Sequence, residues 1–152
     1  MQENKKKPIA SYNDLEVYQE TYSAAIRVNK EIITRLPEYE KFDLINQLRR
    51  SSKAVPRLIA EGYAKRHQKM GFQKYLDDAM SECNETSVGL KQCRDIYNIE
   101  CGDLIEAYER AGRRIYRLAE VWTTFKRRVS QLPCLPARQA NPTSSFKPAS
   151  QP

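Results

Sequence analysis

The sequence predicts an all-α protein, an up-down-up-down four-helix bundle followed by a disordered C-terminal tail. Glycine is scarce, with 5 among 152 residues, and apolar residues recur at helical spacing over long windows. A chain of this length can bury the core of one domain and is short for two. We therefore expect a flexible basic N-terminus at residues 1–11, a bundle at 12–128 and a proline-rich tail at 129–152.

The first helix is expected to begin at an N-cap at Asn13 and to end at Pro37. Its seam, the row of side chains predicted to face the core, alternates spacings of three and four residues. The seam consists of Leu15, Tyr18, Tyr22, Ala25, Asn29, Ile32 and Leu36, widened by Ile26 and Ile33. One side of this helix is therefore predicted to be buried along its length.

The second helix is expected from about Lys41 to Arg66, with basic residues between its apolar positions. Pro56 lacks a backbone donor and should kink or locally unwind this helix. The apolar spacing resumes beyond Pro56, so the helix should not end there. Its seam is Ile45, Leu48, Ser52, Val55 and Ile59.

The third and fourth helices have long seams. The third is expected to stop in a turn at 98–103, and the fourth to start with Asp103 as its N-cap. Cys83 and Cys93 lie in the third seam and are expected to be small buried hydrophobes. The third seam is Phe72, Leu76, Ala79, Cys83, Thr86, Leu90, Cys93 and Tyr97; the fourth is Leu104, Tyr108, Ala111, Ile115, Leu118, Trp122 and Phe125.

The charges are segregated along the chain. The net charge is +7, yet residues 12–126 hold 19 Lys and Arg against 18 Asp and Glu. Residues 49–74 carry eight cations and one acid, residues 77–109 two cations and nine acids, and residues 110–128 seven cations and one acid. The bundle is therefore predicted to have two basic regions and one acidic region.

The basic regions suggest phosphate contacts, which are independent of nucleotide sequence and sensitive to salt. The arginines of the fourth helix have the spacing that places four guanidinium groups along one stripe. Tyr63 and Tyr116 lie near basic positions and are candidates to stack on bases. The alternative is that these cations are solvated, or paired with the acidic third segment within or between subunits. The candidate contacts are Arg49, Arg50, Lys53, Arg57, Lys65, Arg66, Arg110, Arg113, Arg114 and Arg117.

Two carboxylates are expected to have structural roles. Glu61 lies four residues from both Arg57 and Lys65, which favours an ordinary ion pair along the helix. Glu85 is placed to pair with Arg49 or Arg50 of the preceding helix.

Nothing in the sequence predicts catalysis, a cofactor or a metal. The four cysteines are separated by 10, 8 and 33 residues, which matches no common zinc pattern, and there is one histidine. We find no nucleophile constellation and no glycine-rich phosphate loop, so we expect no enzyme. No stretch approaches the length of a membrane span, and the basic start lacks the apolar core of a secretory signal. We expect a cytoplasmic protein.

Several motifs in the first two helices resemble a known family. The chain is similar to the bacterial four-helix-bundle proteins first noticed as reading frames in intervening sequences of 23S ribosomal RNA genes. The chain departs from that family at Leu58, where the family usually has asparagine. It also departs at Ser81-Glu82, where glycine and serine are common. The resemblance covers about residues 12–126 and rests on Leu15-x-Val17-Tyr18-Gln19, Leu36-Pro37-x-x-Glu40-Lys41-Phe42-x-Leu44, Gln47-Leu48-Arg49-Arg50-Ser51, Val55-Pro56 and Ile59-Ala60-Glu61-Gly62.

The resemblance implies a compact bundle that assembles into a pentameric ring. It also implies a role like that of accessory variability proteins of diversity-generating retroelements, which bind a reverse transcriptase and nucleic acid. Our leading hypothesis is a non-enzymatic homo-oligomer that binds nucleic acid through basic surface. The rival hypothesis is a protein-interaction scaffold whose charged blocks pair between subunits, with no nucleic-acid binding.

Overall fold

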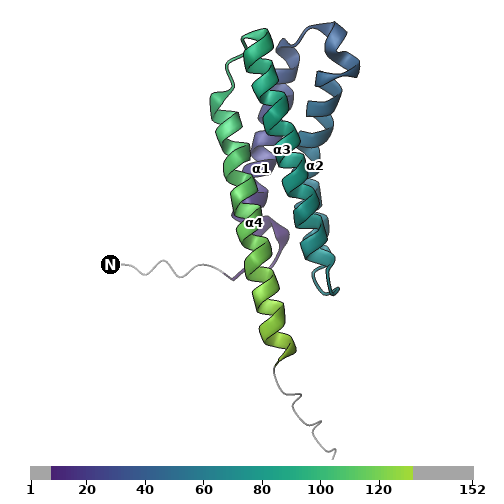
Figure 1. Ribbon diagram of the computed structural model, residues 1–152, viewed down its shortest axis with the longest axis vertical. Coiled ribbons are helices and arrows are strands. Elements are labelled where there is room, and N and C mark those ends of the chain that lie inside the picture. The colour runs from purple at the N-terminus through teal and green to yellow at the C-terminus, as the bar shows by residue number, and fades with distance from the viewer. Residues whose placement is uncertain (1–7, 132–152) are drawn as a thin grey trace, which may run out of the picture.

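The computed structural model describes residues 8–131, which form four long helices in an up-down-up-down arrangement (Figure 1). Helix α1 continues through a π turn, η2, and a 3-10 turn, η3. No strand occurs among the described residues, so the predicted all-α bundle is confirmed. The elements are η1 Tyr12–Asp14, α1 Glu16–Arg27, η2 Val28–Ile32, η3 Ile33–Arg35, η4 Glu38–Phe42, α2 Leu44–Ala64, α3 Gly71–Tyr97 and α4 Gly102–Ser130.

Each helix packs against the helices next to it in the chain, and α1 also packs against α4. Helices α2 and α4 therefore occupy opposite corners of the bundle. The last turns of α4 extend beyond the ends of its neighbours (Figure 1). No helix of the described chain is both long enough and apolar enough to cross a membrane.

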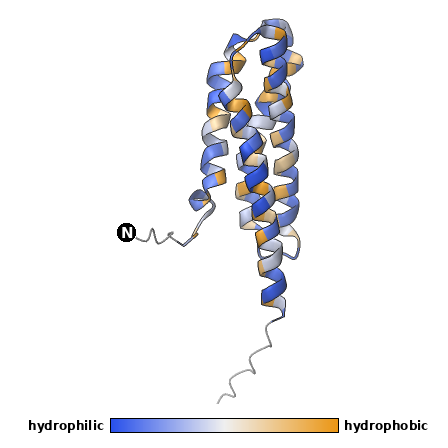
Figure 2. Ribbon diagram, turned by 60° about the vertical axis from the view of Figure 1, so that its left-hand side comes forward, coloured by the Kyte–Doolittle hydropathy of each residue, from blue (hydrophilic) through white to orange (hydrophobic). Residues whose placement is uncertain are grey.

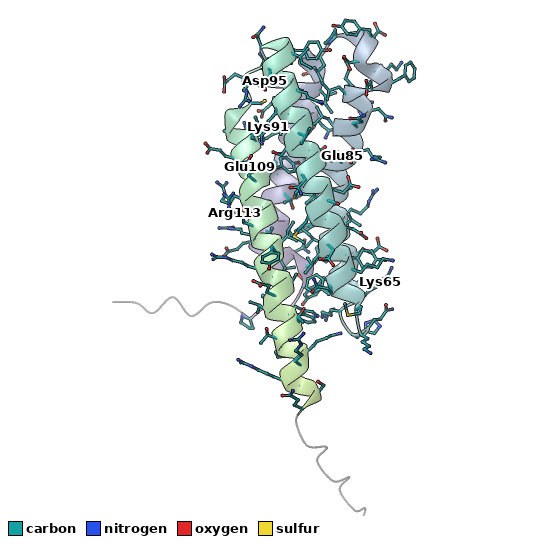
Figure 3. The ribbon with its side chains drawn as sticks, in the orientation of Figure 1. Lys65, Glu85, Lys91, Asp95, Glu109 and Arg113 are labelled. Atoms are coloured by element: carbon teal, nitrogen blue, oxygen red, sulfur yellow. The ribbon has the colours of Figure 1, made fainter. Side chains whose placement is uncertain are left out.

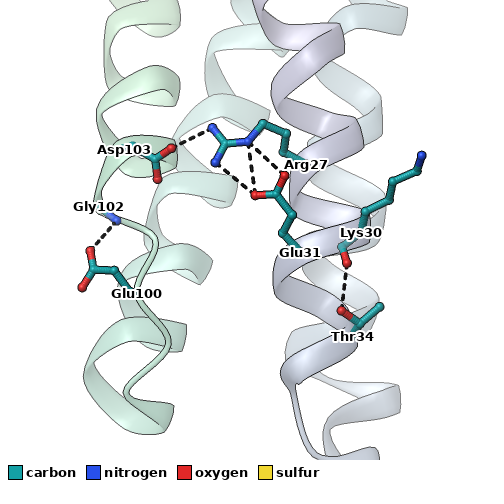
Figure 4. A network of polar contacts seen from close by, with 7 residues as sticks. All are labelled: Arg27, Lys30, Glu31, Thr34, Glu100, Gly102 and Asp103. Atoms are coloured by element: carbon teal, nitrogen blue, oxygen red, sulfur yellow. Dashed lines mark hydrogen bonds and ion pairs between the residues drawn. The ribbon is translucent and has the colours of Figure 1, made fainter.

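Two predicted N-caps are wrong, because other residues precede the first turns. Ser11 caps η1 in a capping box with Asp14, and α1 then begins at Glu16, so Asn13 caps nothing. Helix α4 begins one residue before Asp103, whose carboxylate instead pairs with Arg27 of α1 at 2.7 Å (Figure 4). The predicted end of the third helix is confirmed.

That end is set by Asn98, the residue after α3, which has the left-handed conformation with φ of 53°. Asparagine tolerates this conformation better than most residues and is a common helix terminator. The N–H of Ile99 then bonds back to the carbonyl of Cys93 at 3.2 Å. The chain can therefore turn directly into α4.

The core lies along the predicted seams of α2 and α3. Hydrophobic and hydrophilic residues alternate in short blocks along each helix (Figure 2), as expected of helices buried on one side. Every predicted seam residue of α2 is buried, and so is every one of α3 except the half-buried Tyr97. Cys83 and Cys93 are buried as predicted.

Several polar side chains of the core are hydrogen bonded to one another. The hydroxyl of Thr86 in α3 lies 2.9 Å from that of Ser51 in α2 and 2.8 Å from the Glu82 carbonyl. The amide nitrogen of Asn29 in η2 donates to the Ser52 hydroxyl at 3.2 Å. These bonds join three helices and satisfy groups whose burial would otherwise cost free energy.

The predicted seam of the first helix is wrong at several positions in its N-terminal half. Tyr22 is 52% exposed, Ile26 is exposed and Tyr18 is half-buried. The buried face is offset by one position, because the hydroxyl of Thr21 donates within the helix to the Val17 carbonyl at 2.8 Å and can enter the core. That face consists of Val17, Thr21, Ala24, Ala25, Val28 and Ile32.

Helix α2 continues through Pro56, as predicted, and of the two expected effects of this proline, a kink or local unwinding, the local unwinding is not seen. Pro56 is buried inside the helix, although it cannot donate to the carbonyl of Ser52. Six residues later, Gly62 lies against α3 so closely that an added Cβ would be 2.6 Å from the Cβ of Tyr75. The lack of a side chain at Gly62 therefore permits the close approach of α2 and α3.

The fourth helix is longer than predicted, since Val129 and Ser130 belong to α4. The seam of α4 is buried from Leu104 to Ile115, but Leu118 and Trp122 are half-buried and Phe125 is exposed where the helix leaves the bundle. The expected disorder of the tail from residue 129 is wrong for Val129 and Ser130; the rest of that expectation concerns mainly residues 132–152, and most of the expected flexible N-terminus is residues 1–7. Both segments lie outside the described residues.

Candidate nucleic-acid interface

Four of the ten candidate cations are held by contacts within the bundle. Arg50 of α2 pairs with Glu85 of α3 at 3.1 Å, as predicted, and the hydrogen bond that Arg50 donates to Glu85 raises the pKa of the guanidinium. Figure 3 shows Glu85 on the side of α3 that faces α2. The ion pair of Arg50 with Glu85 therefore links α2 to α3.

The C-terminal end of α2 holds two more of these cations. Lys65 pairs with Glu61 at 2.8 Å, and the hydroxyl of Tyr75 donates to the same carboxylate at 2.9 Å. Lys65 and then Tyr75 lower the pKa of Glu61. Arg66 donates to the Tyr63 carbonyl at 2.8 Å and lies 4.1 Å from the centroid of that ring. The predicted ion pair of Glu61 is confirmed for Lys65.

Arg114 is the fourth candidate cation that is held by contacts within the bundle. Its guanidinium lies 2.8 Å from Glu20 and 3.7 Å from Glu16, both in α1. The arginine stripe of α4 is thus partly compensated from α1. Among the described acids of the third segment, only Glu85 forms an ion pair with a candidate cation.

The other six candidate cations are exposed and form no ion pair among residues 8–131. They form two rows on helices at opposite corners of the bundle, so they lie on separate faces of one subunit. The α2 row is Arg49, Lys53 and Arg57, and the α4 row is Arg110, Arg113 and Arg117.

The α2 row borders a groove of about 510 Å³ between α1 and α2, here called the tyrosine groove. Lys53 and Arg57 line it from α2, and Lys30 lines it from η2. Among residues 8–131, no Asp or Glu lines the groove. Figure 4 shows the Lys30 side chain directed away from the network formed by Arg27, Glu31 and Asp103. The groove therefore combines three cations without a compensating carboxylate in its wall.

Three tyrosines form the aromatic part of this groove. The rings of Tyr18 and Tyr22 are nearly parallel, with centroids 5.9 Å apart and planes 25° apart. Tyr12 meets Tyr18 edge-on at 4.9 Å. Burial, followed by the neighbouring tyrosines, raises the pKa of Tyr18. The phenol of Tyr18 is therefore uncharged at neutral pH.

The α4 row borders a groove of a different character between α3 and α4, here called the mixed groove. It has a volume of about 480 Å³, and Arg113 and Arg117 line it together with Glu109 and Glu120. Glu109 also pairs with Lys91 at 2.8 Å, which lowers the pKa of the carboxyl (Figure 3). Positively and negatively charged side chains therefore both line this groove.

The two tyrosines selected from the sequence are not in the tyrosine groove. The ring of Tyr63 is half-buried against Phe72 and under Arg66. Tyr116 lines the mixed groove, where a hydrogen bond with Glu120 raises the pKa of the phenol. Neither ring lies beside the α2 row.

The tyrosine groove was missed because Tyr18 and Tyr22 fit the apolar period of the first helix. One signal could have found it. Two tyrosines four residues apart are a poor fit to a tight helix interface, and the next helix carries Lys53 and Arg57 four residues apart.

A carboxyl group lies behind the α2 row. Burial raises the pKa of Glu82 in α3, the neighbouring Glu85 raises it further, and Arg50 and Arg57 oppose the shift. One oxygen of Glu82 is buried without a hydrogen-bond partner among the described residues. Glu82, when ionised, therefore places a poorly solvated negative charge behind the α2 row.

The described residues contain no group of three or more His, Cys, Asp or Glu side chains placed to hold a metal ion. Cys83, Cys93 and Cys101 are free thiols in the core. Burial raises the pKa of Cys83 to about 12, so the thiol is protonated at neutral pH. Cys134 lies outside the described residues.

Comparison with known proteins gives one family. The model of the family described as 23S rRNA-intervening sequence protein matches residues 13–119. A search of the curated proteins gives no match. The matched segment begins in η1 and contains all of α2 and α3, the tyrosine groove except Tyr12, and both rows of cations.

Proposed function

Because this chain belongs to the family of 23S rRNA-intervening sequence proteins, we propose that it is a non-enzymatic bundle that binds nucleic acid. The α2 row is the principal contact, and the α4 row is a weaker one. RNA is the nucleic acid that the name of the family favours. The proposal places the protein in the cytoplasm.

The observation that most supports this proposal is that the cations of the α2 row form no ion pair among the described residues. Arg49, Lys53 and Arg57 are exposed, recur every four residues and have no ion-pair partner among residues 8–131. Like charges at this spacing repel, and phosphate groups along a nucleic-acid backbone would compensate them. Arg50, Lys65, Arg66 and Arg114 make internal contacts and are assigned structural roles.

A homo-oligomer would multiply each row of cations by symmetry, and the family resemblance leads us to propose five subunits. Repeated weak contacts in a ring give avidity when one nucleic-acid chain reaches several subunits. Mass by light scattering, with and without RNA, tests assembly and binding together. A monomer mass at all concentrations would contradict the oligomer, and a mass unchanged by RNA at about 50 mM salt would contradict the binding.

The finer proposal is that the protein is an accessory variability protein of a diversity-generating retroelement and contacts its reverse transcriptase. Its support is the resemblance in the first two helices. An adjacent reverse transcriptase gene with a template repeat would support this role, and co-purification of the two proteins would test it directly.

A second candidate function, a protein-interaction scaffold, is favoured by the exposed apolar end of α4. Val121, Phe125 and Val129 recur every four residues and are each about half exposed or more. Such a row suits contact with another protein or another subunit. Changing Phe125 to Ser separates the two functions, because a scaffold should lose its partner or oligomer while RNA binding by a single subunit is retained.

A further inference from the structure

We propose that the tyrosine groove holds an unpaired base of single-stranded RNA, while the α2 row contacts the flanking phosphates. This inference rests on the proposed nucleic-acid binding and names the form of nucleic acid that the site selects. It assigns a role in RNA binding to residues of α1. The net charge of the chain does not reveal this role.

The size and shape of the groove fit a small planar group. Its volume of about 510 Å³ falls within the range of about 300–1,000 Å³ typical of ligand pockets. It is an open groove, so a base could enter from the side while remaining part of a chain. The exposed Ile26 and the buried Pro56 add apolar surface from the two helices.

The arrangement of the tyrosines suits stacking. Tyr18 and Tyr22 present nearly parallel rings, and Tyr22 is 52% exposed, which leaves ring surface accessible to a ligand. Bases of single strands stack on such aromatic side chains with little dependence on sequence. Within a duplex, both faces of a base are covered by its neighbours, so this contact requires an unpaired base.

The charges around the groove fit the phosphates on either side of that base. Lys53 and Arg57 line the groove from α2 and Lys30 lines it from η2, while no carboxylate of the described part of the chain lines it. An uncharged apolar peptide would use the tyrosines but leave the three cations without a partner. A ligand with a planar apolar group between two negative charges uses both features.

The polar group in the groove is also held in place. Asn29, in the π turn, donates its amide nitrogen to the Ala25 carbonyl at 2.8 Å and to the Ser52 hydroxyl at 3.2 Å. Its amide oxygen accepts no hydrogen bond from the described residues. This oxygen provides an oriented acceptor for a donor on a base or for a ribose 2′-hydroxyl. π turns within helices are frequent at functional sites.

The test compares single-stranded and double-stranded RNA on matched tyrosine variants of the full chain. A labelled RNA of about twelve nucleotides is titrated by fluorescence anisotropy at about 50 mM salt, alone and annealed to its complement. Tyr22→Ala should weaken binding of the single strand by about 5- to 150-fold, the loss expected for one stacked base. It should change binding of the duplex by less than about twofold.

Two control variants make the result specific. Tyr22→Phe keeps the ring and should bind the single strand like the wild type. Tyr116→Ala removes a tyrosine of similar exposure, 54%, from the mixed groove and should weaken binding of the single strand much less than Tyr22→Ala does. Equal thermal unfolding temperatures of the variants confirm that the fold is retained, as expected because Tyr22 lies outside the buried face of α1.

The outcomes separate this inference from the proposed function. If the wild type binds neither RNA form, the proposed nucleic-acid binding fails, and the groove assignment fails with it. If both forms bind with a salt-dependent affinity that Tyr22→Ala leaves unchanged, binding stands and the groove assignment is overturned. A DNA strand of the same sequence that binds more tightly than the RNA would overturn the assignment to RNA.

Discussion

The tyrosine groove and the mixed groove are similar in volume and each is lined by exposed cations, yet their surroundings differ. Lys53 and Arg57 face an apolar wall with three tyrosines. Arg113 and Arg117 share their groove with Glu109 and Glu120. Local positive charge alone therefore does not identify a binding surface. What matters is whether nearby carboxylates, such as Glu109 and Glu120 of α4, already compensate the cations.

Reversing the charge of two cations in each row should give the largest difference in RNA affinity between the two grooves. Lys53→Glu with Arg57→Glu should weaken RNA binding by about tenfold or more, because two phosphate contacts become repulsive. Arg113→Glu with Arg117→Glu makes the same change in net charge on the other face and should weaken binding less. Anisotropy titrations at one salt concentration check this, and equal effects of the two pairs would remove the distinction between the grooves.

Removing the carboxylates of the mixed groove should make it resemble the tyrosine groove in charge. Glu109→Gln with Glu120→Gln leaves Arg113 and Arg117 uncompensated and should raise RNA affinity by about threefold. The same titration measures the gain. An unchanged affinity would show that the α4 row is remote from the bound RNA.

The stability of arginine variants should distinguish structural from exposed cations. Arg114→Ala breaks the pair with Glu20 and should lower the free energy of unfolding by up to about 1 kcal/mol. Arg57→Ala removes an arginine without an ion-pair partner and should change it by less than about 0.5 kcal/mol. Urea denaturation of both variants provides the values, and the reverse order would contradict the assigned roles.

Two acids, Glu82 of α3 and Glu109 of the mixed groove, should have opposite effects on pH-dependent stability. The folded-state pKa of Glu82 is raised, so stability falls as the pH rises from the ordinary value of 4.5 through the raised one. Glu82→Gln should therefore be more stable than the wild type at pH 7, and the difference should vanish below about pH 4.5.

Glu109 is the matched control, because Lys91 lowers its folded-state pKa. Its contribution is present above the ordinary value of 4.5 and is lost as the pH falls through the lowered pKa. Glu109→Gln should therefore be less stable at pH 7. Thermal unfolding at a series of pH values checks both signs, and two variants shifting in the same direction would contradict the assignment.

The sequence was sufficient for α2 and α3 because their buried residues keep a regular helical spacing, which also includes the polar Ser52 and Thr86. It failed for α1, where Thr21 enters the core by bonding its hydroxyl to the helix backbone and Tyr22 turns outward. A hydropathy pattern ranks tyrosine above threonine for burial and cannot detect that internal hydrogen bond.

The candidate site was predictable only as a set of charges. The row of Lys53 and Arg57 is evident from their spacing, but the pairing of Arg114 with Glu20 depends on how α1 packs beside α4. The tyrosine groove likewise exists only where α1 lies against α2. Contacts between helices therefore decide which cations remain available to bind nucleic acid. A count of charges along the sequence does not reveal these contacts.

The most direct test of the central claim is the salt dependence of single-stranded RNA binding. The account predicts that the logarithm of affinity falls linearly with the logarithm of salt concentration. Lys53→Ala with Arg57→Ala should make that slope shallower by about 1.4, the value for two lost phosphate contacts, and Arg113→Ala with Arg117→Ala should change it less. A flat dependence for the wild type, or a larger change for the α4 pair, would contradict the account.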